Sequence, residues 1–248
     1  MSARQRYADE LARLDDGEIP AYLTAGSGLP GPRSNLELLY AFGDVAPARL
    51  VLLLADHADE YLRCCGTAAL GRLLLEADDE AAGASSGAAD LPTRAALEAV
   101  LTERARDPMW RVREGAAMAG QRLGAAAPEA LAGLVGRWLD PRDPLVARAA
   151  VAAICEPPIL RPSPLLRAAA LDACERATDV LRAVPPGHRR DADVRTLRQG
   201  LAYCWSVAVA ADPGAGLPRF RALQADDDPD VAWLARENAK KARLAALL

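Results

Sequence analysis

The sequence predicts an all-α protein in which helix pairs stack side by side as a solenoid. Two segments, 107–114 and 230–237, share the pattern Asp-x-x-Trp-x-x-Arg-Glu, and each continues into an Ala-rich stretch. An internal repeat of this kind is typical of solenoids, because each unit needs its neighbours to bury its apolar side. Aromatic residues make up only 4% of the 248 residues, and no segment alternates with a period of two, so a β-sheet is not expected.

Helical periodicity in the first half of the chain is interrupted by short polar or Gly/Pro-rich stretches. Asp16 and Ser34 are the expected N-caps of two helices, because their side chains can accept bonds from the free amides of a first turn. Residues 26–32 should form a connecting loop, and the Ala-, Ser- and Gly-rich stretch near 77–91 should form a flexible one. The expected helices lie at about residues 3–14, 16–23, 34–42, 49–55, 59–76, 92–106 and 108–123.

The second half is divided mainly by prolines that follow an acidic residue. An Asp before Pro can cap a helix, and the proline then fixes the backbone of the first turn. Asp-Pro pairs occur at 107–108, 140–141, 143–144, 212–213 and 228–229. The expected helices lie at about 128–139, 144–155, 164–182, 193–210, 215–224 and 229–245. The whole pattern predicts about six antiparallel helix pairs in a single domain that spans residues 1–248.

The spacing within the repeated pattern resembles the second helix of a HEAT repeat. Asp107 precedes Arg113 by six residues, and Asp230 precedes Arg236 by the same interval. The resemblance implies a right-handed α-α superhelix, in which the Arg of one repeat bonds the Asp of a neighbour to form a ladder. Arg148 matches in part, because its acidic residue is displaced from the position six before it to Asp143.

One further unit departs from the HEAT-like spacing, since Asp59 has Cys65 where the Arg is expected. The physical chemistry of burial agrees with the ladder, because a partly buried guanidinium is costly unless an acidic group accompanies it. Trp110 and Arg113 would lie one turn apart on one helix face, as would Trp233 and Arg236. The main role expected for these Asp, Arg and Trp residues is therefore structural.

A narrower resemblance concerns the segment 198–205, Arg-Gln-Gly-Leu-Ala-Tyr-Cys-Trp. It is similar to a run in the C-terminal helices of HEAT-like alkylpurine DNA glycosylases, with Tyr203 at the aromatic position. In that family an Asn-Trp-Asp-like segment supplies the catalytic carboxylate, and this sequence has no Trp followed directly by Asp. The nearest case is Trp138-Leu139-Asp140, whose Asp is expected to cap a helix. The resemblance thus implies DNA binding without the usual catalytic Asp.

The sequence contains no motif that predicts catalysis, a metal site or a cofactor site. The two histidines, His57 and His188, fall near expected loops, and no zinc spacing or Gly-x-Ser-x-Gly elbow occurs. Residues 26–31 match Gly-x-Gly-x-x-Gly, but no strand precedes them as a dinucleotide site requires. The acidic residues at 226–230 lack the spacing of a calcium loop and are expected to cap a helix. Catalytic residues, a metal and a cofactor are therefore all expected to be absent.

Cysteine use and hydrophobicity predict a cytoplasmic protein that does not enter a membrane. The five cysteines include no Cys-x-x-Cys pair, which is typical of reduced thiols. The first residues lack the apolar stretch of a signal peptide. No apolar run approaches the roughly 20 residues that span a bilayer.

The charge pattern leaves two kinds of partner open. A net charge of −4 argues against a constitutive nucleic-acid binder. Basic residues nevertheless gather at 182–198 and 236–243, where they could form a binding patch or a solvated face shared with acidic neighbours. The candidate binding residues are Arg195, Arg198, Tyr203, Trp233, Arg236 and Lys240.

The leading interpretation is a non-enzymatic HEAT-like scaffold that binds a protein or peptide on its concave face. The second helices of the pairs would supply that surface, with exposed Arg and Trp side chains as anchors. The alternative is a protein that binds double-stranded DNA and is related to the alkylpurine glycosylases. A subunit of a larger enzyme complex is a third possibility that no residue supports.

Overall fold

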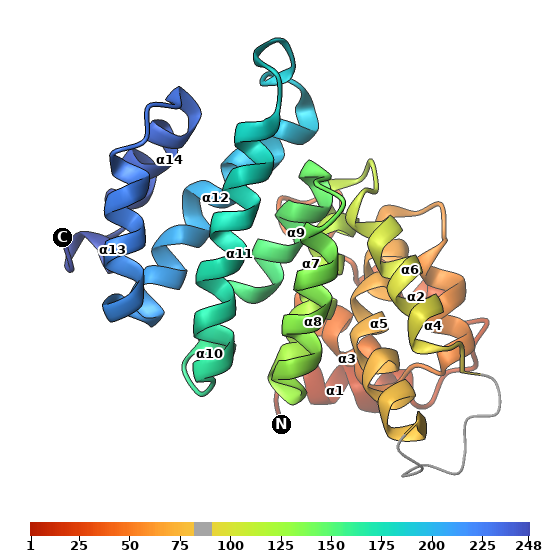
Figure 1. Ribbon diagram of the computed structural model, residues 1–248. Helices are drawn as coiled ribbons and strands as arrows, with labels where there is room; N and C mark the ends of the chain where they lie inside the picture. Colours follow the sequence, from red (N-terminus) through yellow and green to blue (C-terminus); the bar gives the residue numbers. More distant parts are fainter. Residues whose placement is uncertain (82–90) are drawn as a thin grey trace. The chain divides into compact units, whose positions relative to one another are not determined.

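The structure, a computed structural model, describes the backbone of residues 1–81 and 91–248, in which helices are joined by turns and loops (Figure 1). No β-strand occurs in the described residues, which agrees with the predicted all-α class. The chain separates into two compact units, residues 1–123 and 124–248, and the division falls within one helix. The expectation of a single domain over residues 1–248 stays a prediction.

The N-terminal unit contains the first seven helices. They are α1 (Ala3–Leu11), α2 (Ile19–Gly26), α3 (Leu36–Val45), α4 (Ala48–Ala55), α5 (Glu60–Ala81), α6 (Arg94–Ala105) and α7 (Trp110–Ala126), the last of which crosses into the second unit. Helix α5 extends to Ala81, so the first residues of the predicted flexible loop are helical. The rest of that loop, residues 82–90, lies outside the described residues.

The C-terminal unit holds the remaining helices. They are α8 (Pro128–Leu139), α9 (Pro144–Ile154), α10 (Pro157–Leu160), α11 (Pro164–Ala183), the 3-10 helix η1 (Pro186–His188), α12 (Ala192–Ala211), α13 (Pro213–Gln224), α14 (Pro229–Ala239) and α15 (Ala242–Ala245). The single helix expected at 229–245 is therefore two helices, interrupted at Lys240 and Lys241, so that prediction was wrong.

Acidic side chains start four helices in the same way. Asp59, Asp107, Asp143 and Asp228 each accept a hydrogen bond from the amide two residues further on, at 2.9 Å in every case. These bonds satisfy amides that have no partner in a first turn, and they confirm the expected role of Asp before Pro at 107, 143 and 228.

Two of the expected caps in the N-terminal unit were wrong. Asn35, not Ser34, caps α3 by accepting from the Leu38 amide at 3.1 Å. The Nδ2 of Asn35 also donates to the Gly26 carbonyl, which ties the loop to the helix. Asp16 does not cap α2, which begins three residues later; it pairs with Arg49 instead.

Small residues let helices cross closely in the N-terminal unit, where α5 packs against α2, α3, α4 and α6. A Cβ on Gly66 would lie 2.2 Å from the Ala55 amide nitrogen, and one on Gly71 would lie 2.4 Å from the Ala119 carbonyl oxygen. Both distances are too short for any side chain, so these two crossings require glycine.

Helix α12 forms the centre of the C-terminal unit, where it packs against α9, α11, α13, α14 and α15. Trp205 of α12 is buried, and its Nε1 donates to Thr178 Oγ1 of α11 at 3.1 Å. Asn238 of α14 is also buried; its side chain accepts from the Ser206 amide at 2.8 Å and donates to the Leu201 carbonyl at 3.0 Å. Polar groups inside this Ala- and Leu-rich core therefore fix how α11 and α14 meet α12.

The five cysteines are free and buried. Burial raises the pKa of the Cys64 thiol to about 12 and that of the Cys174 thiol above its ordinary value. Thiols in such surroundings are structural rather than reactive. None of the described helices is both long enough and apolar enough to cross a bilayer.

Candidate functional site

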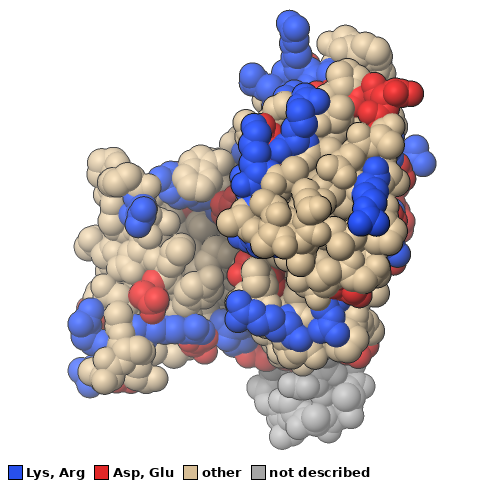
Figure 2. Space-filling model, turned by 90° about the vertical axis from the view of Figure 1, so that its left-hand side faces the viewer, with Lys and Arg blue, Asp and Glu red and all other residues tan. Residues whose placement is uncertain are grey.

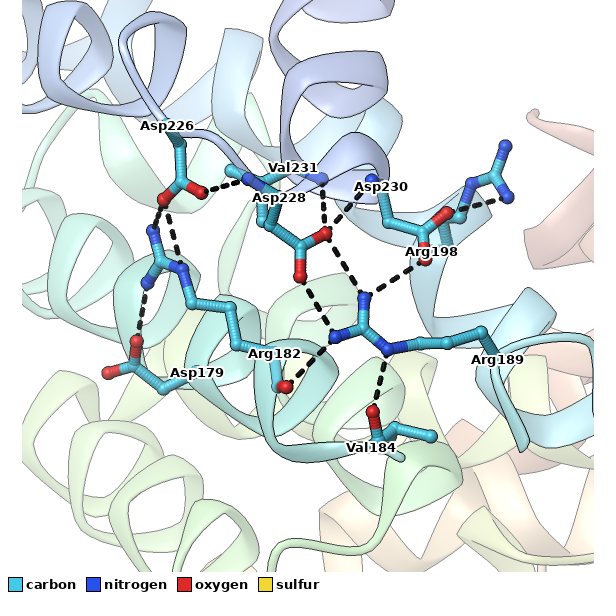
Figure 3. A network of polar contacts seen from close by, with 9 residues as sticks. All are labelled: Asp179, Arg182, Val184, Arg189, Arg198, Asp226, Asp228, Asp230 and Val231. Carbon is cyan, nitrogen blue, oxygen red and sulfur yellow. Dashed lines mark hydrogen bonds and ion pairs between the residues drawn. The ribbon is translucent and has the colours of Figure 1, made fainter. Parts of the chain in front are cut away.

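A polar network joins the start of α14 to the loop before α12 (Figure 3). Asp228 caps α14, and both of its carboxylate oxygens accept from Arg189, at 2.8 and 3.1 Å. The Nε of Arg189 donates to the Val184 carbonyl at 2.7 Å, and its Nη2 donates to the Arg182 carbonyl at 2.9 Å. The guanidinium therefore bridges the end of α11 and the start of α14 with all of its nitrogens engaged.

The charges of this network hold one another ionised. The bonds from Arg189 lower the pKa of Asp228, and the bonds from Asp228 raise the pKa of Arg189. Beside them Arg182 pairs with Asp226, through Nε at 3.1 Å, and with Asp179 at 2.6 Å. Except for Asp179, the side chains of these partners are at least partly buried. The network, named here the clamp, is therefore mainly structural.

Asp230 connects the clamp to an aromatic side chain. It lies between Arg189, at 3.0 Å, and Arg198, at 2.9 Å. The Arg198 guanidinium also lies over the Trp233 ring, 4.0 Å from its centre. A cation stacked on a ring and paired with a carboxylate is held in one orientation, so Arg198 and Trp233 form a rigid element between α12 and α14.

The Asp–Arg ladder involves different partners from those that the spacing predicts. Buried Asp107 accepts from Arg63 of α5 at 2.9 Å and lies 3.5 Å from Arg104 of α6. Arg113 itself donates to the Asp107 and Pro108 carbonyls, at 2.6 and 3.0 Å. In both cases the acid at the start of a helix pairs with an arginine of an earlier helix: Asp107 pairs with Arg63, and Asp230 pairs with Arg198.

The structure also corrects the register of the repeated pattern. Asp107 precedes α7 and caps it, so its structural counterpart is Asp228, two residues before the expected Asp230. Asp230 already lies inside α14. Arg236 is exposed and forms no ion pair within the described part of the chain, so it has no place in a ladder. The aliphatic part of Arg148 packs on Gly200. A Cβ added at Gly200 would lie 3.1 Å from Cγ of Arg148.

The predicted binding residues lie on α12, on α14 and, for Lys240, directly after α14, and the two helices pack against each other. Arg195 and Tyr203 are exposed and lie on one side of α12, eight residues apart; Trp233, Arg236 and Lys240 follow one side of α14. Two contacts join members of this set, Arg198 with Trp233 and Arg243 with Tyr203. The set is named here the basic aromatic face: Arg195, Arg198, Tyr203, Trp233, Arg236, Lys240 and Arg243.

Some cations of the basic aromatic face already have partners and others have none. Lys240 pairs with Glu237 at 2.6 Å, and Arg243 donates to the Tyr203 hydroxyl at 2.9 Å while lying over its ring. Arg195 and Arg236 form no ion pair with any described residue. Seen from the side where α13 and α14 lie, Lys and Arg side chains gather in groups among uncharged residues and a few carboxylates (Figure 2).

The two units differ in charge, which the net charge of the whole chain conceals. Residues 124–248 carry 17 Lys and Arg against 15 Asp and Glu, a formal charge of +2. Residues 1–123 carry 13 against 19, a formal charge of −6. Counting charges by halves would have found this asymmetry. The clamp at Arg189 and Asp228 had no such signal, because its members come from separate segments.

The clamp predicts a measurable dependence of stability on pH. Because the pKa of Asp228 is lowered in the folded state, its ionised form stabilises the fold above the ordinary Asp value of about 3.9. That contribution is lost as pH falls through the lower folded value. Asp228→Asn should cost about 1–2 kcal/mol at neutral pH, as lost cap and charge interactions do. Urea unfolding should show that the difference from the wild type shrinks with acidification.

Asp227→Asn is the matched control for this measurement, because Asp227 is exposed and forms no hydrogen bond or ion pair in the described structure. Its effect should be near zero at every pH. A difference between wild type and Asp228→Asn that stays constant down to strongly acidic pH would contradict the assignment of the lowered pKa to the clamp.

Comparisons with known proteins assign no family to the chain. No family model matches it, and no curated protein matches it. Two solved structures, each described as the crystal structure of an engineered protein, align over 100% of this chain and over 99% and 98% of their own. Their sequence identity is 17% and their TM-scores are 0.39 and 0.38. Similarity at this level supports no conclusion about fold or function.

Proposed function

We propose that the helix pairs within each unit stack as HEAT-like repeats. In the C-terminal unit the pairs are α8 with α9, α11 with α12, and α13 with α14, and the second helices α9, α12 and α14 contact one another in turn. The bonds from Arg63 to Asp107 and from Arg198 to Asp230 support the proposal, because each joins an arginine to the acid of a later helix. The right-handed superhelix of about six pairs stays a prediction.

We further propose that the protein is a non-enzymatic adaptor that binds an acidic segment of a partner protein on the basic aromatic face. The observation that carries this proposal is the Arg198–Trp233 stack, with the exposed cations Arg195 and Arg236 one helical turn away on α12 and α14. Trp, Tyr and Arg are the residues that dominate binding energy at protein interfaces. A rigid aromatic anchor costs little entropy on binding, and unpaired guanidinium groups favour carboxylates.

A protein partner fits this face better than duplex DNA does. The charges of Arg198 and Lys240 are already offset by Asp230 and Glu237. DNA binding depends on neutralising several phosphates, and its affinity comes mainly from that term. Duplex DNA remains the alternative, favoured by the positive C-terminal unit, and a separate DNA-binding measurement on the same variant tests it.

Selection from a random peptide display library tests the proposal. Wild-type protein should enrich peptides rich in Asp and Glu. The variant Arg195→Glu/Arg236→Glu should bind the selected peptides at least about tenfold more weakly, since two favourable charges become repulsive. Arg221→Glu on α13 is the matched control, because Arg221 is exposed and unpaired in the described structure; it should leave binding within about twofold of the wild type.

Two outcomes would overturn the adaptor proposal. One is selection that enriches no acidic sequence. The other is binding of a mixed-sequence DNA duplex, with a steep loss on added salt, that the double variant abolishes while peptides show no binding. The second outcome would favour the DNA-binding alternative.

A further inference from the structure

A cavity of about 540 Å³ lies at one end of the C-terminal unit, apart from the clamp. It is lined by Pro157 and Leu160 of α10, by Arg161 and Arg167, by Val207, Ala210 and Ala211 of α12, and by Arg243 of α15. Helix α10 contacts both α11 and α12, and α15 contacts α12, so packed helices form its walls. Its volume falls within the range of about 300–1,000 Å³ that is usual for ligand pockets.

The lining combines an apolar floor with three guanidinium groups and contains no carboxylate. The partly exposed Pro157, Ala210 and Ala211 supply its apolar surface, beside the buried Leu160 and Val207. The acidic residue nearest the end of α12, Asp212, turns its side chain to the Ala215 amide, where it caps α13. Arg161, Arg167 and Arg243 therefore carry positive charge that no described acid offsets through an ion pair.

Two of these guanidinium groups are held in place by the protein. Nη1 of Arg167 donates to the Leu160 and Arg161 carbonyls, at 3.3 and 3.0 Å. Arg243 donates to the Tyr203 hydroxyl at 2.9 Å and stacks on that ring. Neutral acceptors orient the two arginines without cancelling their charge, so donors remain for an anion.

Another hollow in the same unit shows what a neutralised lining looks like. Arg142 and Arg176 line it together with Asp140 and Asp179, and Arg176 pairs with Asp140 at 2.7 Å. The cavity beside α10 differs because its lining holds three arginines and no acid.

We propose that this cavity binds a small organic anion, with a phosphate or carboxylate head between Arg161, Arg167 and Arg243. The apolar part of the ligand lies on Pro157, Ala210 and Ala211. Charge-assisted bonds from guanidinium to an anion are directional and strong, whereas the small Ala side chains leave room for a ring. This site goes beyond the proposed peptide surface, since Arg161 and Arg167 do not belong to the basic aromatic face.

Isothermal titration calorimetry with naphthyl phosphate tests the proposal, with inorganic phosphate and neutral naphthol as comparison ligands. Naphthyl phosphate should bind saturably to wild-type protein, and the two comparison ligands at least about tenfold more weakly, because each satisfies only one half of the cavity. Arg161→Gln/Arg167→Gln should weaken binding by about tenfold or more. Arg221→Gln removes a cation outside the cavity and should leave binding unchanged.

A second variant separates the cavity from charge alone. Ala210→Leu fills the floor without altering any cation and should also weaken binding about tenfold. If the double arginine variant does not fold, as judged by circular dichroism, Arg161→Gln and Ala210→Leu test the site, because both positions are only partly enclosed. Absence of saturable binding, equal affinity for inorganic phosphate, or wild-type affinity in these variants would overturn the proposal. Arg243 belongs to both sites, but Arg161 and Arg167 belong only to the cavity. Selected peptides should therefore still bind Arg161→Gln/Arg167→Gln, which distinguishes failure of this site from failure of the peptide surface.

Discussion

Replacing Asp107 by alanine should lower the free energy of unfolding by about 3–5 kcal/mol, the usual cost of removing one partner of a buried ion pair. The Asp107 side chain is only 2% exposed; it accepts from Arg63 at 2.9 Å and from the Met109 amide at 2.9 Å. Its loss would deprive Arg63 of its nearest acid, would leave Arg104 with only the exposed Asp56 as an acidic partner, and would remove the cap of α7. Chemical denaturation measures the effect.

Asp56 provides the matched control for the Asp107 prediction. It contacts the same two arginines, Arg63 at 3.7 Å and Arg104 at 3.1 Å, but its side chain is 77% exposed. Asp56→Ala should therefore cost no more than about 1 kcal/mol, as exposed ion pairs do. If Asp107→Ala and Asp56→Ala lowered the free energy of unfolding equally, burial of Asp107 would not be the reason for its contribution to stability.

Replacing Trp205 by alanine should have an effect of the same size. Trp205 is 1% exposed at the junction of α11 and α12, and its indole donates to Thr178 at 3.1 Å. Truncating a buried aromatic side chain leaves a cavity and typically costs about 3–5 kcal/mol. The unfolding midpoint in urea or heat should fall accordingly, and the loss should be confined to stability if the peptide surface is formed by exposed residues.

Two further variants divide the Trp205 effect into its parts. Trp205→Phe keeps a ring but loses the hydrogen bond to Thr178, so a smaller cost of about 1–2 kcal/mol is expected. Trp233→Ala removes a partly exposed ring that Arg198 covers; its cost should be about 1 kcal/mol, while its effect on peptide binding should be large. A loss of stability for Trp233→Ala as great as that for Trp205→Ala would contradict this division between core and surface.

Local chemistry made much of the helix pattern predictable. Asp before Pro at 107, 143 and 228 signals a helix start because both the cap bond and the proline backbone act within one turn. The error at Ser34 has a local cause as well, since Asn35 beside it is an equally good cap. The error at Lys240 and Lys241 arose because neither residue breaks a helix by itself.

Long-range partners could not be read from the same pattern. The repeated sequence pattern aligns Asp230 with Asp107. The cap hydrogen bonds show instead that Asp228 is the structural counterpart of Asp107, because similar sequences can begin at different positions of a helix. The partners of these acids, Arg63 and Arg189, come from segments about 40 residues away. No spacing rule within one helix reaches that far.

The sequence by itself determined an all-helical chain with an Ala- and Leu-rich core, acidic caps and basic residues gathered toward its C-terminal end. Those features depend on hydrogen bonds and side-chain preferences within a few residues. Tertiary structure alone decided which arginine meets which acid, which cations stay unpaired on α12 and α14, and that three guanidinium groups line one cavity. These outcomes depend on how helices pack, because burial and distance between segments set the energy of each charge.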